Sequence, residues 1–174
     1  EYRGQEYSYG QDPRIVTGQE FEALLAKQSG QGDKEIGRQG KLPSSAVFIQ
    51  CIGPADKYCA RTCCTTALKQ ALKLKELNPA AQITVLYKDI RTFGFKERLY
   101  TQAREQGVLF IRYDDKHKPQ VGIESRELSV ERGAKNNSLD ALHSTLHVQV
   151  WEPMLGREMM LTPDMIVLSN PTVP

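Results

Sequence analysis

The sequence lacks any uninterrupted apolar run of about eighteen residues, the shortest length that spans a membrane as a helix. It also lacks an excess of one charge sign, because a net charge of +2 over 174 residues is too small to favour nucleic acid as a partner. No charged and then apolar leader is visible at the start, which is Glu1 without a methionine. Together with a hydrophobic content of 40%, these absences predict a globular, cytoplasmic protein with no transmembrane segment and no nucleic acid partner.

Cysteine is scarce, and its few positions are confined to one stretch. The four cysteines are Cys51, Cys59, Cys63 and Cys64, and the rest of the chain has none. Disulfide frameworks belong mainly to secreted proteins, and this sequence shows no sign of secretion. We therefore expect reduced thiols, and their grouping favours a metal centre.

The cysteines fall where a predicted strand gives way to a predicted helix. An apolar run from Ala46 to Ile52 predicts a buried strand, which Gly53-Pro54 interrupts. From residue 60, apolar or small residues recur at spacings of three and four, which predicts a helix over 60–77. Two thiols therefore lie at the end of the strand or in the loop beyond it, and two lie in the first turns of the helix.

This placement favours a negatively charged metal centre. Unpaired N–H groups at the start of a helix carry partial positive charge, which stabilises thiolates. Lys57 and Arg61 flank the cysteines and add positive charge, so both are candidate cofactor-binding residues. A [4Fe-4S] cluster held by the four thiolates is the first interpretation of the stretch.

Two other interpretations of the cysteines stay open. Structural zinc usually takes pairs of cysteines two to four residues apart, and the adjacent Cys63 and Cys64 match that spacing poorly. Four buried cysteines that act only as small apolar side chains are the second alternative.

The rest of the chain alternates short apolar strands with helices. A capping box at Thr17-Gly18-Gln19-Glu20 predicts a helix that ends near Lys27, and a flexible connection is expected over 30–43. The later pattern predicts strands over 83–87, 108–111 and 165–168, and a helix over 95–106 with Phe95 on its inner face. It also predicts an antiparallel meander whose strands cover 121–123, 127–130, 146–151 and 158–161. The predicted fold class is α/β, a three-layer Rossmann-like domain over 44–174 preceded by an N-terminal segment over 1–43.

Four stretches also carry a family resemblance. They are Val47-Phe48-Ile49-Gln50-Cys51-Ile52-Gly53, Tyr58-Cys59-Ala60-Arg61-Thr62-Cys63-Cys64, Ala67-Leu68-Lys69-Gln70-Ala71, and Leu86-Tyr87-Lys88-Asp89-Ile90-Arg91-Thr92-Phe93-Gly94. These motifs resemble the A subunits of heterodisulfide reductases and the related flavin subunit of the quinone-interacting oxidoreductase complex.

The resemblance implies the fold of the second dinucleotide domain in thioredoxin-reductase-like flavoproteins. It implies Cys51, Cys59, Cys63 and Cys64 as ligands of a [4Fe-4S] cluster. It further implies Lys69 as a residue near FAD, and a solvated lysine on the polar face of the helix is the alternative for that position. It also implies electron transfer within an oxidoreductase, with other subunits of a reductase complex as partners, and association of identical copies is left open. The flavin domain with its own glycine fingerprint is missing, so the chain resembles a piece of such a protein, with FAD expected in the full-length form.

Binding of NAD(P) is an alternative that the sequence disfavours. Dinucleotides need a glycine-rich turn after the first strand, and Gly53 is the one glycine there. Asp89 is placed like an acid that binds a ribose, but pairing with Arg91 is the commoner situation for such a carboxylate. The three histidines are too scattered along the chain for a metal triad: His117, His143 and His147.

Overall fold

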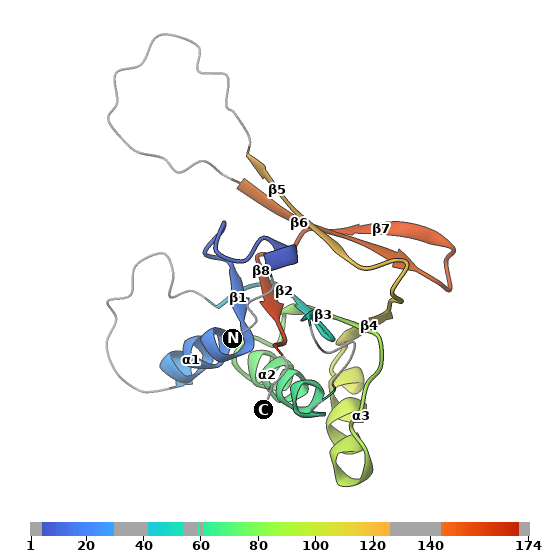
Figure 1. Ribbon diagram of the computed structural model, residues 1–174. Coiled ribbons are helices and arrows are strands. Elements are labelled where there is room, and N and C mark those ends of the chain that lie inside the picture. The colour runs from blue at the N-terminus through green and yellow to red at the C-terminus, as the bar shows by residue number, and fades with distance from the viewer. Residues whose placement is uncertain (1–4, 30–41, 54–58, 60, 126–143, 171–174) are drawn as a thin grey trace, which may run out of the picture.

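The computed structural model describes residues 5–29, 42–53, 59, 61–125 and 144–170. The order of the elements alternates strands and helices and then continues with strands alone (Figure 1). They are β1 (Ile15–Thr17), α1 (Gly18–Ser29), β2 (Ser45–Ile49), α2 (Thr62–Leu77), β3 (Gln82–Tyr87), α3 (Glu97–Glu105), β4 (Leu109–Arg112), β5 (Gln120–Ser125), β6 (Ser144–Glu152), β7 (Arg157–Leu161) and β8 (Met165–Leu168). None of the helices in these ranges is long and apolar enough to cross a membrane.

The strands form two sheets. Five parallel strands lie in the order β1-β8-β2-β3-β4, and three antiparallel strands lie in the order β5-β6-β7. The helices cover one face of the parallel sheet and the antiparallel sheet covers the other (Figure 1). This arrangement of helices, parallel sheet and antiparallel meander confirms the predicted three-layer α/β fold.

Strand β2 shows why the central strands are continuously apolar in the sequence. Successive side chains of a strand point to opposite faces, and both faces of this sheet are covered. Ala46 and Phe48 lie in the core under the helices, whereas Val47 and Ile49 lie in the core under the meander. The strand ends at Ile49, three residues earlier than the sequence indicates, so Gln50 and the residues after it belong to the site loop.

The first helix begins with the capping box that the sequence predicts. The hydroxyl of Thr17 lies 3.4 Å from the backbone nitrogen of Glu20, and a carboxylate oxygen of Glu20 accepts from the backbone N–H of Thr17 at 2.7 Å. Phe21 then packs edge-on against Phe48, with ring centroids 5.5 Å apart. The sequence did not predict the three-residue strand β1, because Ile15-Val16-Thr17 is too short for a period and ends in the capping residue itself.

The helix predicted over 95–106 differs from the observed one at its start. A 3-10 turn occupies Gly94–Lys96, and α3 begins at Glu97. The prediction that Phe95 faces inward is wrong, since its side chain is 89% exposed. In the meander, β5, β6 and β7 confirm three of the predicted strands, and the fourth, over 127–130, lies outside the described residues.

An ion pair in the residues before β1 is hydrogen-bonded to the first residue of β6 in the meander. The Asp12 carboxylate is buried and accepts from the Arg14 backbone at 2.8 Å and from the half-buried Arg14 guanidinium at 2.9 and 2.6 Å. The same guanidinium donates to the Ser144 hydroxyl at 2.7 Å. Hydrogen bonds from Arg14 lower the pKa of Asp12, although burial acts in the opposite direction. The network joins residues that lie 132 positions apart along the chain.

We predict that Asp12→Asn lowers the free energy of unfolding by about 1–3 kcal/mol at pH 7, because the half-buried guanidinium loses its charged partner. The folded-state pKa of Asp12 is depressed, so its contribution is present above the ordinary value of 3.8 and is lost as pH falls below it. Urea unfolding at several pH values should show the difference from the unsubstituted chain shrinking below about pH 4. The control Glu76→Gln breaks an exposed pair with Lys73 and should change stability by less than about 1 kcal/mol.

Candidate functional site

The cysteines lie at the carboxyl ends of β2 and β3, beside the amino end of α2. Cys51 follows β2 after one intervening residue, and Cys63 and Cys64 are the second and third residues of α2. In open α/β sheets this edge is where ligands bind, because loops from neighbouring parallel strands meet there. The structure therefore places these thiols where the sequence predicts them.

One backbone carbonyl brings the two sides of the site together. The sulfur of Cys51 lies 4.0 Å from the carbonyl oxygen of Asp89, and the sulfur of Cys64 lies 3.7 Å from the same oxygen. Asp89 is in the loop after β3, which pairs with β2 in parallel register. Thiols from the β2 loop and from the first turn of α2 thus point toward one place.

The other two thiols belong to the same group. Cys63 directly precedes Cys64 in the first turn of α2, and the charge of Cys59 contributes to raising the pKa of both Cys51 and Cys63. All four cysteines are free of disulfides. Cys63 and Cys64 are buried, and the other two are half-buried. The four predicted ligands therefore lie within electrostatic reach of one another.

The described residues show no preformed site for a single metal ion. Within the described ranges, no three His, Cys, Asp or Glu side chains converge closely enough to hold a single metal ion. The choice between a cluster and zinc therefore stays a prediction.

The surroundings of the thiols shift the pKa values of neighbouring cysteines in opposite directions. The hydrogen bond between the adjacent thiols lowers the pKa of Cys64 to about 6 and raises the pKa of Cys63. Burial raises the pKa of the Cys51 thiol, and backbone hydrogen bonds from Lys88 and Asp89 oppose that rise. A further backbone hydrogen bond from Arg91 favours the Cys64 thiolate. The loop after β3 thus supplies N–H groups that stabilise negative charge on sulfur.

The backbone around the thiols is strained. Cys51 has φ of +58° and Arg61 has φ of +59°, a left-handed conformation that residues other than glycine rarely adopt. Each such residue costs about 1–2 kcal/mol, and strain of this kind gathers at functional sites. Gly53, at +57°, adopts the same region without that cost.

The predicted cofactor-binding cations have different positions. Arg61 immediately precedes α2 and is exposed, beside the cysteines as expected. Lys57 lies outside the described residues. Lys69 is exposed on α2, where it lines a shallow hollow with Leu72 and with Leu99 and Gln102 of the α3 side. The structure places Lys69 on the helix that carries two of the thiols, and its role toward FAD stays a prediction.

Arg91 is a site residue that sequence reasoning noted only as a partner for Asp89. Its guanidinium donates to the Asp89 carboxylate at 2.8 Å, which confirms that pairing. This hydrogen bond raises the pKa of Arg91, and the nearby charges of Cys59 and Cys51 act in the same direction. No local pattern in the sequence signals this role, because Arg91 reaches the thiols only through the pairing of β3 with β2.

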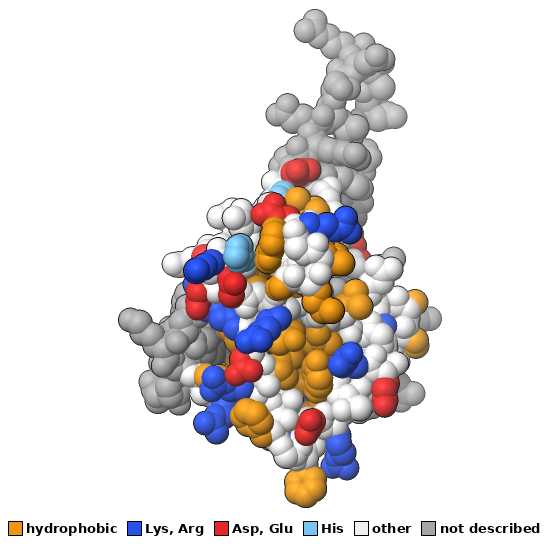
Figure 2. All heavy atoms as spheres, turned by 90° about the vertical axis from the view of Figure 1, so that its right-hand side faces the viewer, with side chains coloured by type: hydrophobic (Ala, Val, Ile, Leu, Met, Phe, Trp, Pro, Cys, Tyr) orange, Lys and Arg blue, Asp and Glu red, His pale blue; other side chains and the backbone are white. Residues whose placement is uncertain are grey.

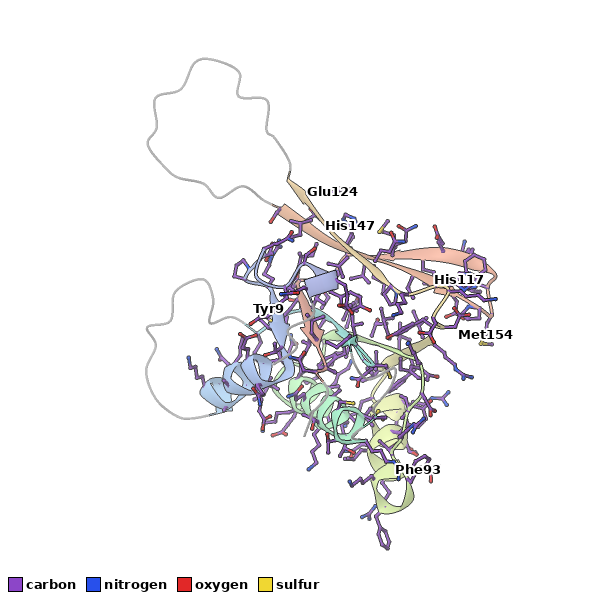
Figure 3. All side chains as sticks on the ribbon, viewed as in Figure 1. Tyr9, Phe93, His117, Glu124, His147 and Met154 are labelled. Carbon is purple, nitrogen blue, oxygen red and sulfur yellow. The ribbon has the colours of Figure 1, made fainter. Side chains whose placement is uncertain are left out.

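The histidines lie on the meander side of the molecule. Figure 3 shows His147 on β6 and His117 near the start of β5, both on the meander side of the parallel sheet. His117 bonds to Asp114 at 2.9 Å and stacks on Trp151. His143 lies outside the described residues. The two described histidines therefore take no part in the thiol group.

The face that carries α3, β4 and β7 is apolar at its centre, with Lys and Arg side chains around it (Figure 2). Several large apolar side chains of this part of the chain are strongly exposed: Phe93, Phe95, Leu109, Met154 and Met160. Phe93 lies beside α3 (Figure 3), in the loop that begins after β3 and contains Asp89. The loop that contacts the thiols therefore also reaches an exposed apolar surface.

Comparisons with known proteins show similarity to the A subunits of heterodisulfide reductases. No protein-family model matches the sequence. The chain is 35% identical to the iron-sulfur A subunit of the CoB--CoM heterodisulfide reductase of Methanocaldococcus jannaschii, over 95% of this chain and 23% of that protein. It is 32% identical to the A subunit of the H(2):CoB-CoM heterodisulfide,ferredoxin reductase of Methanothermobacter marburgensis, over 97% and 24%. The A subunit of a ferredoxin/F(420)H(2)-dependent CoB-CoM heterodisulfide reductase of Methanosarcina acetivorans is 38% identical, over 63% and 15%. The chain thus spans about a quarter or less of these relatives.

The strain at Arg61 can be measured directly. We predict that Arg61→Gly gives a free energy of unfolding about 1 kcal/mol higher than Arg61→Ala, because only glycine adopts the left-handed conformation without a steric penalty. Both substitutions remove the same charge, so the comparison isolates the backbone. Equal stability of the two variants, measured by urea unfolding of the metal-free reduced protein, would show that Arg61 is not strained.

Proposed function

The chain belongs to the family of heterodisulfide reductase A subunits, and from this premise we propose that it is an electron-transfer module of a flavin and iron–sulfur oxidoreductase. The supporting observation is the convergence of the Cys51 and Cys64 sulfurs on one carbonyl oxygen, with Cys63 next to Cys64 in the first turn of α2. The four cysteines hold one [4Fe-4S] cluster through the spacing Cys-x7-Cys-x3-Cys-Cys.

Each part of the site has a separate task in this proposal. Cys51, Cys59, Cys63 and Cys64 supply thiolates, and the backbone of the loop after β3 donates hydrogen bonds to two of them. A bound cluster supplies one-electron chemistry, accepting and releasing single electrons. Arg61 and Lys57 add positive charge that favours the more negative, reduced state, which raises the reduction potential.

The activity of the whole protein belongs to the same proposal. FAD works with the cluster in the full-length protein, and Lys69 lies near the flavin, where a cation stabilises its reduced anionic form. The relatives are named as subunits of heterodisulfide reductases, so the partners proposed here are other electron-transfer subunits of such a complex. Docking of such a subunit brings its redox centre close to the thiols, because single electrons must pass between that centre and the cluster.

Reconstitution tests the cluster. We expect the reduced chain, incubated anaerobically with iron and sulfide, to bind about four irons and four sulfides and to absorb broadly in the visible range. Cys63→Ser should bind far less of both, whereas Thr66→Ser, an exposed neighbour on the same helix, should bind as much as the unsubstituted chain. Purified protein that contains zinc without sulfide would instead indicate a zinc-stabilised docking domain. Saturable NAD(P)H binding that survives Cys63→Ser would indicate a dinucleotide-dependent reductase.

The charge effect has its own test. We predict that Arg61→Gln lowers the one-electron midpoint potential of the reconstituted cluster by tens of millivolts, because a unit charge near the site contributes on the order of 1 kcal/mol at intermediate dielectric. Lys73→Gln removes a charge farther along α2 and should leave the potential unchanged. An equal shift in both variants, measured by redox titration, would mean that the effect reflects net charge alone.

A further inference from the structure

Gln50, which lies between β2 and the first cysteine, is held by three separate parts of the fold. Its backbone N–H donates to the carbonyl of Leu86 on β3 at 2.9 Å. Its side-chain amide donates to the Ser169 hydroxyl, after β8, at 2.8 Å. Its backbone carbonyl accepts from the hydroxyl of Tyr113, after β4, at 2.5 Å. Gln50 is 1% exposed, so these bonds are shielded from water.

Cys51, the residue after Gln50, needs these bonds to hold its backbone in place. Cys51 holds a left-handed backbone conformation that is unfavourable for any residue with a side chain. A conformation of this kind persists only where the surrounding structure fixes the backbone. Because the peptide that joins Gln50 to Cys51 carries the carbonyl bound by Tyr113, the tyrosine hydroxyl acts directly on the strained link.

Tyr113 itself is placed by the core. Its ring is 2% exposed and packs in the cluster between the parallel sheet and the meander. Its backbone N–H donates to the carbonyl of Tyr87, the last residue of β3, at 2.9 Å. The hydroxyl therefore reaches the site from a rigid position on the neighbouring strand end.

We propose that Tyr113 is a positioning residue for the site, and that its hydroxyl, through the Gln50 carbonyl, holds the Cys51 thiolate in the geometry that binds the metal centre. The inference deepens the proposed function and rests on it. Ser169 supports the same segment through a second contact, since its own N–H donates to the Ile49 carbonyl at 3.0 Å. The residue before Cys51 is thus fixed through both its side chain and its backbone.

Tyr113→Phe removes the hydroxyl and keeps the buried ring. In the reconstituted protein under anaerobic conditions, we expect cluster loss to an iron chelator to be about fivefold faster, which corresponds to one hydrogen bond of ordinary strength. In the metal-free reduced protein, alkylation of Cys51 by iodoacetamide, followed by peptide mass spectrometry, should also be faster, while alkylation of Cys63 should change little. The matched control is Tyr100→Phe, whose ring packs on Phe110 on the helix side of the parallel sheet, whereas Tyr113 packs on the meander side.

A purely structural role gives a different result. If Tyr113→Phe lowers the melting temperature but leaves the chelation rate and the Cys51 alkylation rate equal to those of Tyr100→Phe, the positioning role is wrong. Should Tyr113→Phe not fold, Ser169→Ala removes the other restraint on Gln50, and the same two rates decide. Failure of the unsubstituted chain to bind iron and sulfide would overturn the proposed function, and the alkylation comparison would still test the positioning of Cys51.

Discussion

The parallel pairing of β2 with β3 is the constraint on which the site depends. Their register sets Ile49 opposite Leu86, so the loops that follow the two strands begin side by side. One loop carries Cys51 and the other carries the Asp89 carbonyl, and α2 returns over the same edge with Cys63 and Cys64. Because the pairing is buried on both faces, its position is fixed by the whole core.

The same edge carries the strain and the charge. Cys51 and Arg61, in left-handed conformations, lie on either side of the cysteine loop. Hydrogen bonds with the residues that follow β4 and β8 hold Gln50, the residue before Cys51. The N–H groups of the β3 loop and the amino end of α2 face thiols that burial alone would keep protonated. Backbone strain and N–H groups that stabilise negative charge are both properties expected of a site that binds an anionic cluster.

The sequence predicted the layers and the position of the thiols, because strand and helix periods and the cysteine spacing are local signals. It could not predict the Asp89 carbonyl, Arg91 or Tyr113 as parts of the site, since each reaches the thiols or Gln50 only through the pairing of β2, β3 and β4. Strand β1 was too short for a period, and Phe95 was placed inward by a helical spacing that the 3-10 turn interrupts. Local pattern thus revealed the candidate ligands, and tertiary contacts added the residues that support them.

X-ray absorption at the iron edge of the reconstituted chain is the decisive measurement for the cluster, because it reports the atoms around iron without reference to activity. If the four thiolates hold a [4Fe-4S] cluster, every iron has only sulfur neighbours and lies close to other irons, and Cys51→Ser replaces one sulfur by oxygen or loses iron altogether. Iron with mostly nitrogen or oxygen neighbours and no nearby iron would show that the cysteines do not hold such a cluster.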